Sequence, residues 1–167
     1  MSVGRLCKQK NQQLLIRAYF LFLKTCNNFE LHIVGDGPDS IKLKNLCKKL
    51  NISKNVKFFG WKKNVNKYYA NSKIYVLTSL YEGLPNSLID SLNHELVVIS
   101  SNVSGVNDIY GNNCVVLKNS TPHDLCCAMI SSVKNYNKYL IKVQKQKKYI
   151  KNFLNSKLKQ EVIKILK

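Results

Sequence analysis

Acidic residues are scarce in this chain of 167 residues, which narrows the partners it can have. Nine aspartates and glutamates stand against 27 lysines and arginines, so the formal net charge at pH 7 is +18. This imbalance indicates an anionic partner, such as a nucleic acid, an acidic lipid surface or a phosphorylated ligand. Only Arg5 and Arg17 are arginines. Because base-specific recognition depends on arginine side chains, we expect no specific nucleic-acid partner.

Long apolar runs and paired cysteines are also missing. No run approaches the roughly 18 apolar residues that a membrane-spanning helix needs. Arg17 interrupts the stretch LLIRAYFLFL, and no small-residue cleavage motif follows it, so we expect an amphipathic helix there rather than a signal peptide. The six cysteines form no C-x-x-C pair, which argues against a zinc site or a disulfide framework. Reduced, buried thiols and a cytoplasmic location are the expectation.

The hydrophobic pattern alternates between short apolar runs and longer stretches with helical spacing. Continuous runs such as LHIV (31–34) and IYVL (74–77) are typical of strands buried on both faces. Strands joined by helical crossovers form parallel sheets, so we predict an α/β fold with a single Rossmann-like, doubly wound parallel sheet. The expected strands are 2–6, 31–34, 56–60, 74–77, 96–99 and 114–117, and the expected helices are 11–26, 39–50, 64–71, 85–93 and 122–133.

The end of the chain reads as a long amphipathic helix. We predict a Rossmann-like domain over residues 1–133 and a basic helical extension over 134–167 that packs on the same domain. The extension holds eleven lysines and one acidic residue, which gives it a net charge of +10. Its apolar stripe consists of Tyr136, Leu140, Val143, Ile150 and Leu154.

Two interpretations of this basic helix stay open. It is either a solvated surface helix packed on the sheet, or an attachment to anionic lipid at the inner face of the membrane, worth about 1 kcal/mol per lysine. A coding sequence rich in A and T would also favour lysine and asparagine without any partner. A basic membrane- or nucleic-acid-binding protein is therefore one alternative function.

Polar and glycine residues follow five of the predicted strands. Ligands of open parallel sheets bind beyond the carboxyl ends of the strands, so these loops should converge on one site. The loops begin at Arg5, at Gly35-Asp36-Gly37-Pro38, at Gly60-Trp61, at Glu82-Gly83 and at Ser104-Gly105. The turn GDGP is not a G-x-G-x-x-G fingerprint, so a dinucleotide-dependent oxidoreductase is poorly supported. We expect it to be a turn in which Pro38 starts the next helix.

Two cations stand near the start of the first predicted helix. Arg5 and Lys10 lie where the exposed amides of a helix already favour anions, and a diphosphate suits such a place. Taken alone, both residues could equally be ordinary surface cations of a lysine-rich protein.

The segment YEGLPNSLID (81–90) carries the most specific chemistry. Pro85 suits the first helical turn, so Gly83 and Leu84 would present free amides to a ligand. Asn86 and Asp90 are four residues apart on one helix face, and Glu82 can reach the same space. Carboxylates accept hydrogen bonds from vicinal hydroxyls, as in sugars and ribose. Carboxylates beside cations therefore indicate a site for a sugar nucleotide.

These motifs together resemble a known family. VGRL, Lys10, IVGDGP, VKFFGW, SLYEGLPNSLIDSL and VVIS occur in the order and spacing of the family 4 glycosyltransferases of the GT-B fold. The resemblance covers about residues 2–133 and concerns the C-terminal, nucleotide-sugar-binding domain of that fold.

The resemblance implies roles for the charged residues. Arg5 and Lys10 match the basic pair that stabilises the donor diphosphate as it leaves. Glu82 matches the first acid of a motif with two acids separated by seven residues, and would hold the transferred sugar. The family retains the anomeric configuration and needs neither a metal nor another cofactor, so catalysis would consist of positioning and charge stabilisation.

The resemblance also implies a donor-binding set. The amides of Gly83, Leu84 and Asn86 would cradle the sugar and phosphate, and Asp90 would bind the ribose hydroxyls. The base would lie near Gly60 and Trp61. The expected donor is a UDP-sugar carrying a hexose or an N-acetylhexosamine, and the expected acceptor is a glycan or a lipid-linked molecule of polysaccharide biosynthesis.

The chain departs from the family pattern in two respects. Asp90 is one methylene shorter than the usual glutamate, so a ribose contact would need a small shift or a bridging water. The N-terminal domain that binds the acceptor has no counterpart here. A partner polypeptide would have to supply it, or the sequence is a truncated reading frame or a fragment, so activity of the chain alone is not expected. A non-catalytic nucleotide-sugar-binding module is the second alternative function.

Overall fold

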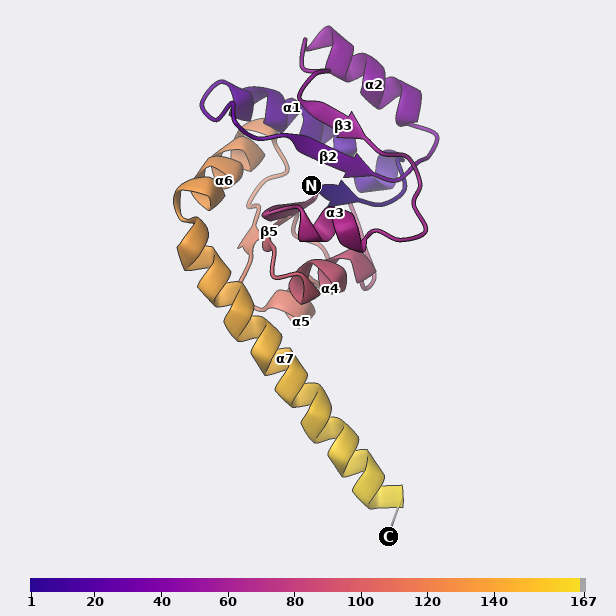
Figure 1. Ribbon diagram of the computed structural model, residues 1–167, viewed down its shortest axis with the longest axis vertical. Coiled ribbons are helices and arrows are strands. Elements are labelled where there is room, and N and C mark those ends of the chain that lie inside the picture. Colours follow the sequence, from indigo (N-terminus) through magenta and orange to yellow (C-terminus); the bar gives the residue numbers. More distant parts are fainter. Residues whose placement is uncertain (166–167) are drawn as a thin grey trace.

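The computed structural model describes residues 1–165, with side chains described for residues 1–152 (Figure 1). Six strands alternate with helices along this part of the chain. The strands are β1 (Ser2–Val3), β2 (Leu31–Val34), β3 (Val56–Phe58), β4 (Ile74–Leu77), β5 (Val97–Ser100) and β6 (Val115–Val116). The helices are a short 3-10 turn η1 (Lys8–Lys10), α1 (Gln12–Leu23), α2 (Ser40–Lys49), α3 (Asn66–Ala70), α4 (Asn86–Asn93), α5 (Val106–Tyr110), α6 (Pro122–Lys134) and α7 (Tyr136–Ile165).

All strand pairs of the described chain are parallel, which confirms the predicted α/β fold. β1, β2 and β3 form one set of three in that order, and β4, β5 and β6 form a second. The two sets meet at Met1. Its carbonyl accepts from the Val76 amide at 2.9 Å and its amine donates to the Ile74 carbonyl at 2.6 Å. The spatial order is therefore β3-β2-β1-β4-β5-β6, which is a Rossmann order. The central strands β1 and β4 are connected through these two backbone bonds of Met1.

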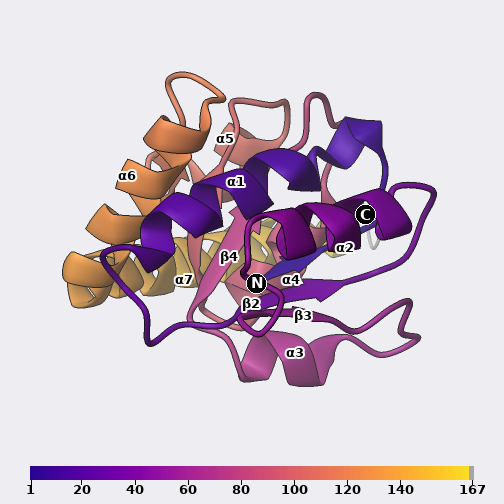
Figure 2. The same cartoon turned by 90° about the horizontal axis from the view of Figure 1, so that it is seen from above.

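Helices cover both faces of the strands, as Figure 2 shows for α1 and α2 on one side and α3 on the other. One apolar core lies under α1, α2 and α6 and contains Ile33, Val76 and Ile99 from the strands. A second core lies under α3, α4, α5 and α7 and contains Tyr75 and Val98. Successive strand residues alternate between the two cores, which explains the unbroken apolar character of the strands.

Some predicted boundaries are wrong. The helix expected over 11–26 ends at Leu23, and the amides of Thr25 and Cys26 turn back to the Phe22 carbonyl at 3.0 and 2.9 Å. Pro38 does not start α2, which begins at Ser40. α5 and η1, of five and three residues, were not predicted.

The helix α7 packs on the domain through its first half. Val143 is fully buried, and the Gln146 side chain donates to the Ile109 carbonyl at 2.9 Å. Lys147 pairs with Glu95 at 2.9 Å. The second half projects away from the body of the molecule in Figure 1. Leu154 of the predicted apolar stripe lies outside the described side chains. Within the described residues, no helix is apolar enough over a sufficient length to cross a bilayer.

Candidate functional site

Two loops at the carboxyl edge lie backbone against backbone. A side chain at Gly35 would place its Cβ 1.9 Å from the Gly4 carbonyl oxygen, and one at Gly37 would come within 2.4 Å of the Leu6 oxygen. The Leu6 amide donates to the Asp36 carbonyl at 2.9 Å. The glycines of GDGP therefore leave room for the backbone of the loop after β1 to pack against them. The backbone that approaches these two glycines is the protein's own.

Lys10 and Glu82 meet at this edge although they are 72 residues apart. The Lys10 ammonium lies 2.5 Å from the Glu82 Oε1, and the Ser79 hydroxyl donates to the same oxygen at 2.5 Å. The Glu82 side chain is only 8% exposed, against 21% for Lys10. The carboxylate is thus held by two donors in a sheltered position, and both donate to Oε1, so its second oxygen is left for a ligand within the described part of the chain.

Backbone contacts fix the loop after β4 to the segment before α1. The Leu80 amide donates to the Gln9 carbonyl at 2.8 Å, and the Gln9 side chain donates to the Tyr81 carbonyl at 3.0 Å. The Thr78 hydroxyl donates to the Lys10 carbonyl at 2.9 Å. Because donors on both segments take part, Glu82 is positioned by a network and not by the lysine alone.

Arg5 directly follows Gly4, and the side chain of Lys10 lies beside Gly4. A Cβ at Gly4 would lie 3.5 Å from the Lys10 Cε, so the lysine stem runs alongside the residue before Arg5. Arg5 is exposed, and its carbonyl accepts from the Gln12 side chain at 2.9 Å. The two cations therefore lie on the same edge of the sheet.

Arg5 and Trp61 line one hollow of about 460 Å³, together with Val34, Asp36 and Lys62. Trp61 is 72% exposed, so its ring is available to a ligand. Gly60 has φ +66°, and its carbonyl accepts from the Gly35 amide at 2.9 Å, which fixes the loop that carries the tryptophan. The predicted base-binding region thus adjoins the predicted diphosphate-binding residue.

The loop from Glu82 to α4 has exposed amides. Pro85 is extended, with φ −76° and ψ 101°, and caps α4 instead of lying in its first turn, which corrects the prediction. Within the described part of the chain, the amides of Gly83 and Leu84 have no backbone acceptor. Gly105, with φ +77°, packs against the backbone of this loop. A Cβ at Gly105 would lie 2.7 Å from the Gly83 carbonyl oxygen, so the contact requires glycine.

Asp90 lies one turn beyond Asn86 on α4 and near the buried tyrosines. Burial raises the pKa of Tyr75 most strongly, and the charges of Glu82 and Asp90 raise it further. The Tyr75 hydroxyl donates to the Val3 carbonyl at 3.3 Å. The charges of both carboxylates therefore affect the pKa of the buried Tyr75 hydroxyl, which also contacts the end of β1. Glu82 and Asp90 thus border the same region.

The structure brings the predicted residues to one edge of the sheet. Lys10 and Glu82 are in contact, Gly83, Leu84 and Asn86 continue from Glu82, and Arg5 shares a hollow with Trp61. The roles given to them remain predictions. Sequence reasoning missed Ser79, Thr78 and Tyr75, although a hydroxyl inside the apolar run IYVL and two hydroxyls directly after it were visible signals.

Comparison with known proteins places these features in a family. The family model described as glycosyl transferases group 1 matches residues 1–160. An N-acetyl-D-galactosaminyltransferase of Campylobacter jejuni that acts on a diphospho-undecaprenol-linked glycan is 31% identical over 99% of this chain and 47% of its own length. An uncharacterized glycosyltransferase of Methanocaldococcus jannaschii is 42% identical over 60% of this chain and 25% of its own length.

Solved structures show the same fold. TarM of S. aureus has a TM-score of 0.83 and 24% identity over 89% of this chain and 31% of its own length. The catalytic domain of a cholesterol-α-glucosyltransferase from Helicobacter pylori has a TM-score of 0.78 and 20% identity over 92% of this chain and 98% of the solved domain. The chain spans less than half the length of the two curated relatives named above. The resemblance to family 4 enzymes is confirmed, and the chain belongs to the group 1 glycosyl transferases.

Proposed function

We propose that this chain is the donor-binding half of a retaining, metal-independent glycosyltransferase. It binds a nucleotide diphosphate-sugar and supports transfer of a hexose or N-acetylhexosamine to a glycan or lipid-linked acceptor. The observation that carries the proposal is the sheltered Lys10–Glu82–Ser79 cluster at the carboxyl edge, the place where open parallel sheets bind ligands.

The cluster suits a sugar beside a diphosphate. Glu82 keeps one oxygen bound to Lys10 and Ser79 and has acceptor capacity left for sugar hydroxyls. Lys10 has two further N–H groups for a phosphate. The free amides of Gly83 and Leu84 add uncharged donors for the oxygens of the same ligand.

Loss of the diphosphate is the step that needs stabilisation. When the bond between the anomeric carbon and the phosphate oxygen breaks, its electron pair stays on the leaving group, whose negative charge grows. Arg5 and Lys10 lie on the edge where that charge would develop. Each close charge pair is worth roughly 4 kcal/mol at an effective dielectric constant of 20, before desolvation is subtracted. Such preorganised charge is the main catalytic device available to these residues.

The base and ribose would occupy the remaining part of the edge. Trp61 offers an exposed ring beside Arg5, and Asp90 offers a carboxylate on α4. The names of relatives favour UDP as the nucleotide, since a matched Escherichia coli enzyme uses UDP-Gal and a diphosphoundecaprenol-linked acceptor. An acceptor carried on a polyprenol diphosphate is therefore our proposal for this chain too.

Titration calorimetry with UDP, UDP-galactose and UDP-N-acetylgalactosamine tests the site. We expect Glu82→Gln to weaken binding of the UDP-sugars at least tenfold and of UDP itself much less, because the carboxylate holds the sugar. Arg5→Ala should weaken all three ligands. Arg17→Ala, an exposed arginine on α1, is the matched control and should change none of them. Unchanged affinity in both site variants would overturn the proposal.

A non-catalytic nucleotide-sugar-binding module is the competing function. Both functions predict UDP-sugar binding, so turnover must separate them. We expect transfer to a polyprenol diphosphate-linked glycan only when a polypeptide that supplies an acceptor domain is mixed in. Binding without transfer in any such mixture would favour the module.

A further inference from the structure

A group of buried hydroxyls lies at the carboxyl ends of β4 and β5, beside the candidate site. Its members are Thr78, Ser79, Ser100 and Ser101, and each is at most 2% exposed. Strands that are buried on both faces normally carry apolar residues, and a buried hydroxyl needs a hydrogen-bond partner. Three of these four hydroxyls donate to backbone carbonyls, whereas Ser79 donates to the carboxylate of Glu82.

The backbone around Ser79 is held on both sides. The Ser79 carbonyl accepts from the Ser101 hydroxyl at 2.6 Å, and the amide of the next residue, Leu80, donates to the Gln9 carbonyl at 2.8 Å. A single torsion with three staggered positions then sets the direction of the Ser79 hydroxyl. In the position that the structure shows, this hydroxyl donates to Glu82 Oε1 at 2.5 Å. Ser79 is therefore a directional donor on a fixed support.

Lys10 donates to the same oxygen but is less suited to orient it. Its ammonium is a point charge on a flexible stem, and its side chain is more exposed than that of Glu82. A diphosphate bound beside Lys10 carries negative charge, so it competes with Glu82 for the ammonium. The buried, uncharged Ser79 hydroxyl is not open to that competition. When a donor is bound, Ser79 is thus the more constant partner of Glu82.

The direction of the second oxygen, Oε2, depends on these two donors. Both donate to Oε1, which restrains rotation of the Glu82 carboxylate about its last torsion. Without Ser79 the carboxylate could turn to follow the Lys10 ammonium alone, and Oε2 would turn with it. A hydrogen bond from a sugar hydroxyl to Oε2 depends steeply on angle, so such a rotation would weaken it.

We propose that Ser79 is the positioning residue for recognition of the donor sugar. Its hydroxyl holds Glu82 so that Oε2 faces the sugar hydroxyls, and Ser101 holds Ser79. The two donors to Oε1 then differ in function, because Lys10 serves the diphosphate as well and Ser79 serves the sugar alone. This inference rests on the proposed function, since it assumes a donor sugar at Glu82.

Calorimetry of the 167-residue protein with UDP, UDP-galactose and UDP-N-acetylgalactosamine tests the division of roles. We expect Ser79→Ala to weaken binding of the UDP-sugars about fivefold, the usual effect of one hydrogen bond, and binding of UDP less than about twofold. Lys10→Met should weaken all three ligands. Equal losses for UDP and the UDP-sugars in Ser79→Ala would mean that the serine only supports the loop, and would overturn the proposal.

A double-mutant cycle shows whether Ser79 acts through Glu82. Glu82→Ala removes the carboxylate, so adding Ser79→Ala to it should cause no further loss of UDP-sugar affinity. Losses that add up would mean that the serine acts independently of the carboxylate, and would overturn the proposal. Weakened UDP-sugar binding in Glu82→Ala beside normal binding in Ser79→Ala would overturn this inference and leave the proposed function standing. Unchanged binding in Glu82→Ala would overturn both.

Two further variants control for the loss of a buried hydroxyl. Ser132→Ala on α6 also removes the hydroxyl of a fully buried serine, and it should change none of the three affinities. Circular dichroism establishes that each variant is folded. If Ser79→Ala does not fold, Ser79→Cys takes its place, because the thiol keeps the size of the side chain and is only a weak donor. The same difference between UDP and the UDP-sugars is expected, and its absence would overturn the proposal.

Discussion

At the scale of single residues, Gly35 is the most constrained position at the carboxyl edge. Its φ is +137°, and a Cβ would lie 1.9 Å from the Gly4 oxygen, which is backbone and cannot move aside. We expect Gly35→Ala to lower the free energy of unfolding by roughly 3 kcal/mol or more, since strain and a clash act together. Urea unfolding measures the loss.

Gly83 provides the matched control for that prediction. A Cβ there would meet no atom within 4 Å. Gly83→Ala should therefore change the free energy of unfolding by less than about 0.5 kcal/mol. Equal losses in the two variants would mean that the close approach of the loops after β1 and β2 does not exist.

Tyr75 connects the two carboxylates of the site to the end of β1. Removing its hydroxyl leaves the Val3 carbonyl without that donor, so Tyr75→Phe should lower the free energy of unfolding by about 1 kcal/mol. It should also change UDP-sugar affinity by a smaller factor than Glu82→Gln, because the hydroxyl lies beneath the site. A larger effect on affinity than that of Glu82→Gln would make Tyr75 a direct ligand contact.

At the residue scale, Glu82 and Trp61 were singled out because a carboxylate and an indole follow the ends of predicted strands, and Lys10 because it stands near the start of a predicted helix. The structure brings Lys10 and Glu82 into contact, and the roles of all three residues remain predictions. Ser79 and Thr78 were missed because their hydroxyls act through partners that are near in space. The Thr78 hydroxyl bonds to a carbonyl 68 residues away, a relation that a single sequence does not display.

At the scale of elements, residues 134–167, which include α7, carry +10 of the net charge of +18. Lys145 and Lys148 are exposed on the described part of the helix, while Val143 faces the core. If the lysine face attaches to anionic lipid, the double change Lys145→Glu and Lys148→Glu should weaken binding to phosphatidylserine vesicles by at least 2 kcal/mol, about 30-fold. Vesicle sedimentation at 0.1 M salt measures it.

The same charge change on α2 controls for net charge. Lys42 and Lys49 are exposed on that helix, far along the sequence from α7. Lys42→Glu with Lys49→Glu should affect vesicle binding less than the α7 pair. Equal effects would indicate attraction by overall charge, and the helix would then be a solvated surface element.

Element prediction depended on length. β2 and β4 were located to the residue, because a short, mainly apolar run between polar residues leaves few alternative boundaries. β1 was expected over 2–6 and spans only Ser2–Val3, because the chain leaves β2 after Gly4, whose amide still donates to the Val34 carbonyl at 3.0 Å. The end of α1 was misplaced because Lys24 and Thr25 continue a helical composition while the chain already turns.

At the scale of the whole molecule, the join between the two sets of strands depends on Met1. Its amine has a folded-state pKa of about 5, lowered from 8 by burial. A lowered amine pKa means that the folded state prefers the neutral form. Its stabilising contribution is therefore complete above pH 8 and is lost as the pH falls through 5.

Acetylation of Met1 isolates that contribution. The acetylated protein has no amine to titrate, so its melting temperature should fall less between pH 8 and pH 5 than that of the free protein. His32 and Glu30 lie nearby and are present in both forms, so only the difference between the two curves counts. Parallel curves would show that the amine is not buried in solution.

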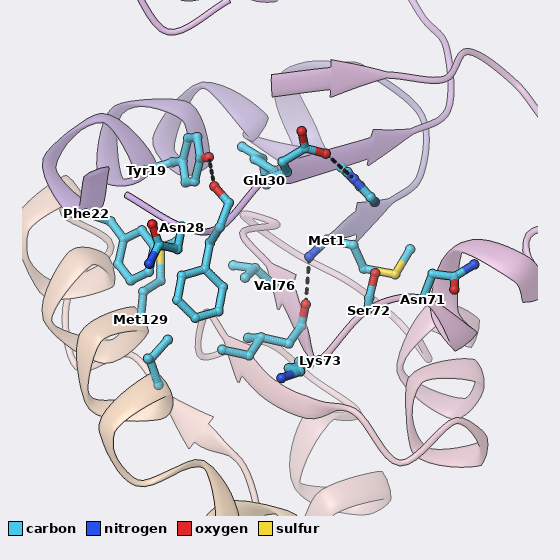
Figure 3. A pocket seen from close by; sticks show the side chains of 15 residues that line it. Met1, Tyr19, Phe22, Asn28, Glu30, Asn71, Ser72, Lys73, Val76 and Met129 are labelled. Atoms are coloured by element: carbon cyan, nitrogen blue, oxygen red, sulfur yellow. Dashed lines mark hydrogen bonds and ion pairs between the residues drawn. The ribbon is translucent and has the colours of Figure 1, made fainter. Parts of the chain in front are cut away.

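The contacts between the two strand sets are distributed unevenly. At the carboxyl edge, side chains and amides of residues 78–82 hold the segment 9–10 at four points. At the amino edge, among the residues that the structure describes, two backbone bonds of Met1 join the sets beside a hollow of about 340 Å³ (Figure 3). Thermal opening of the molecule should accordingly begin with separation of the two strand sets at Met1, and the contacts between residues 78–82 and 9–10 at the carboxyl edge should break last.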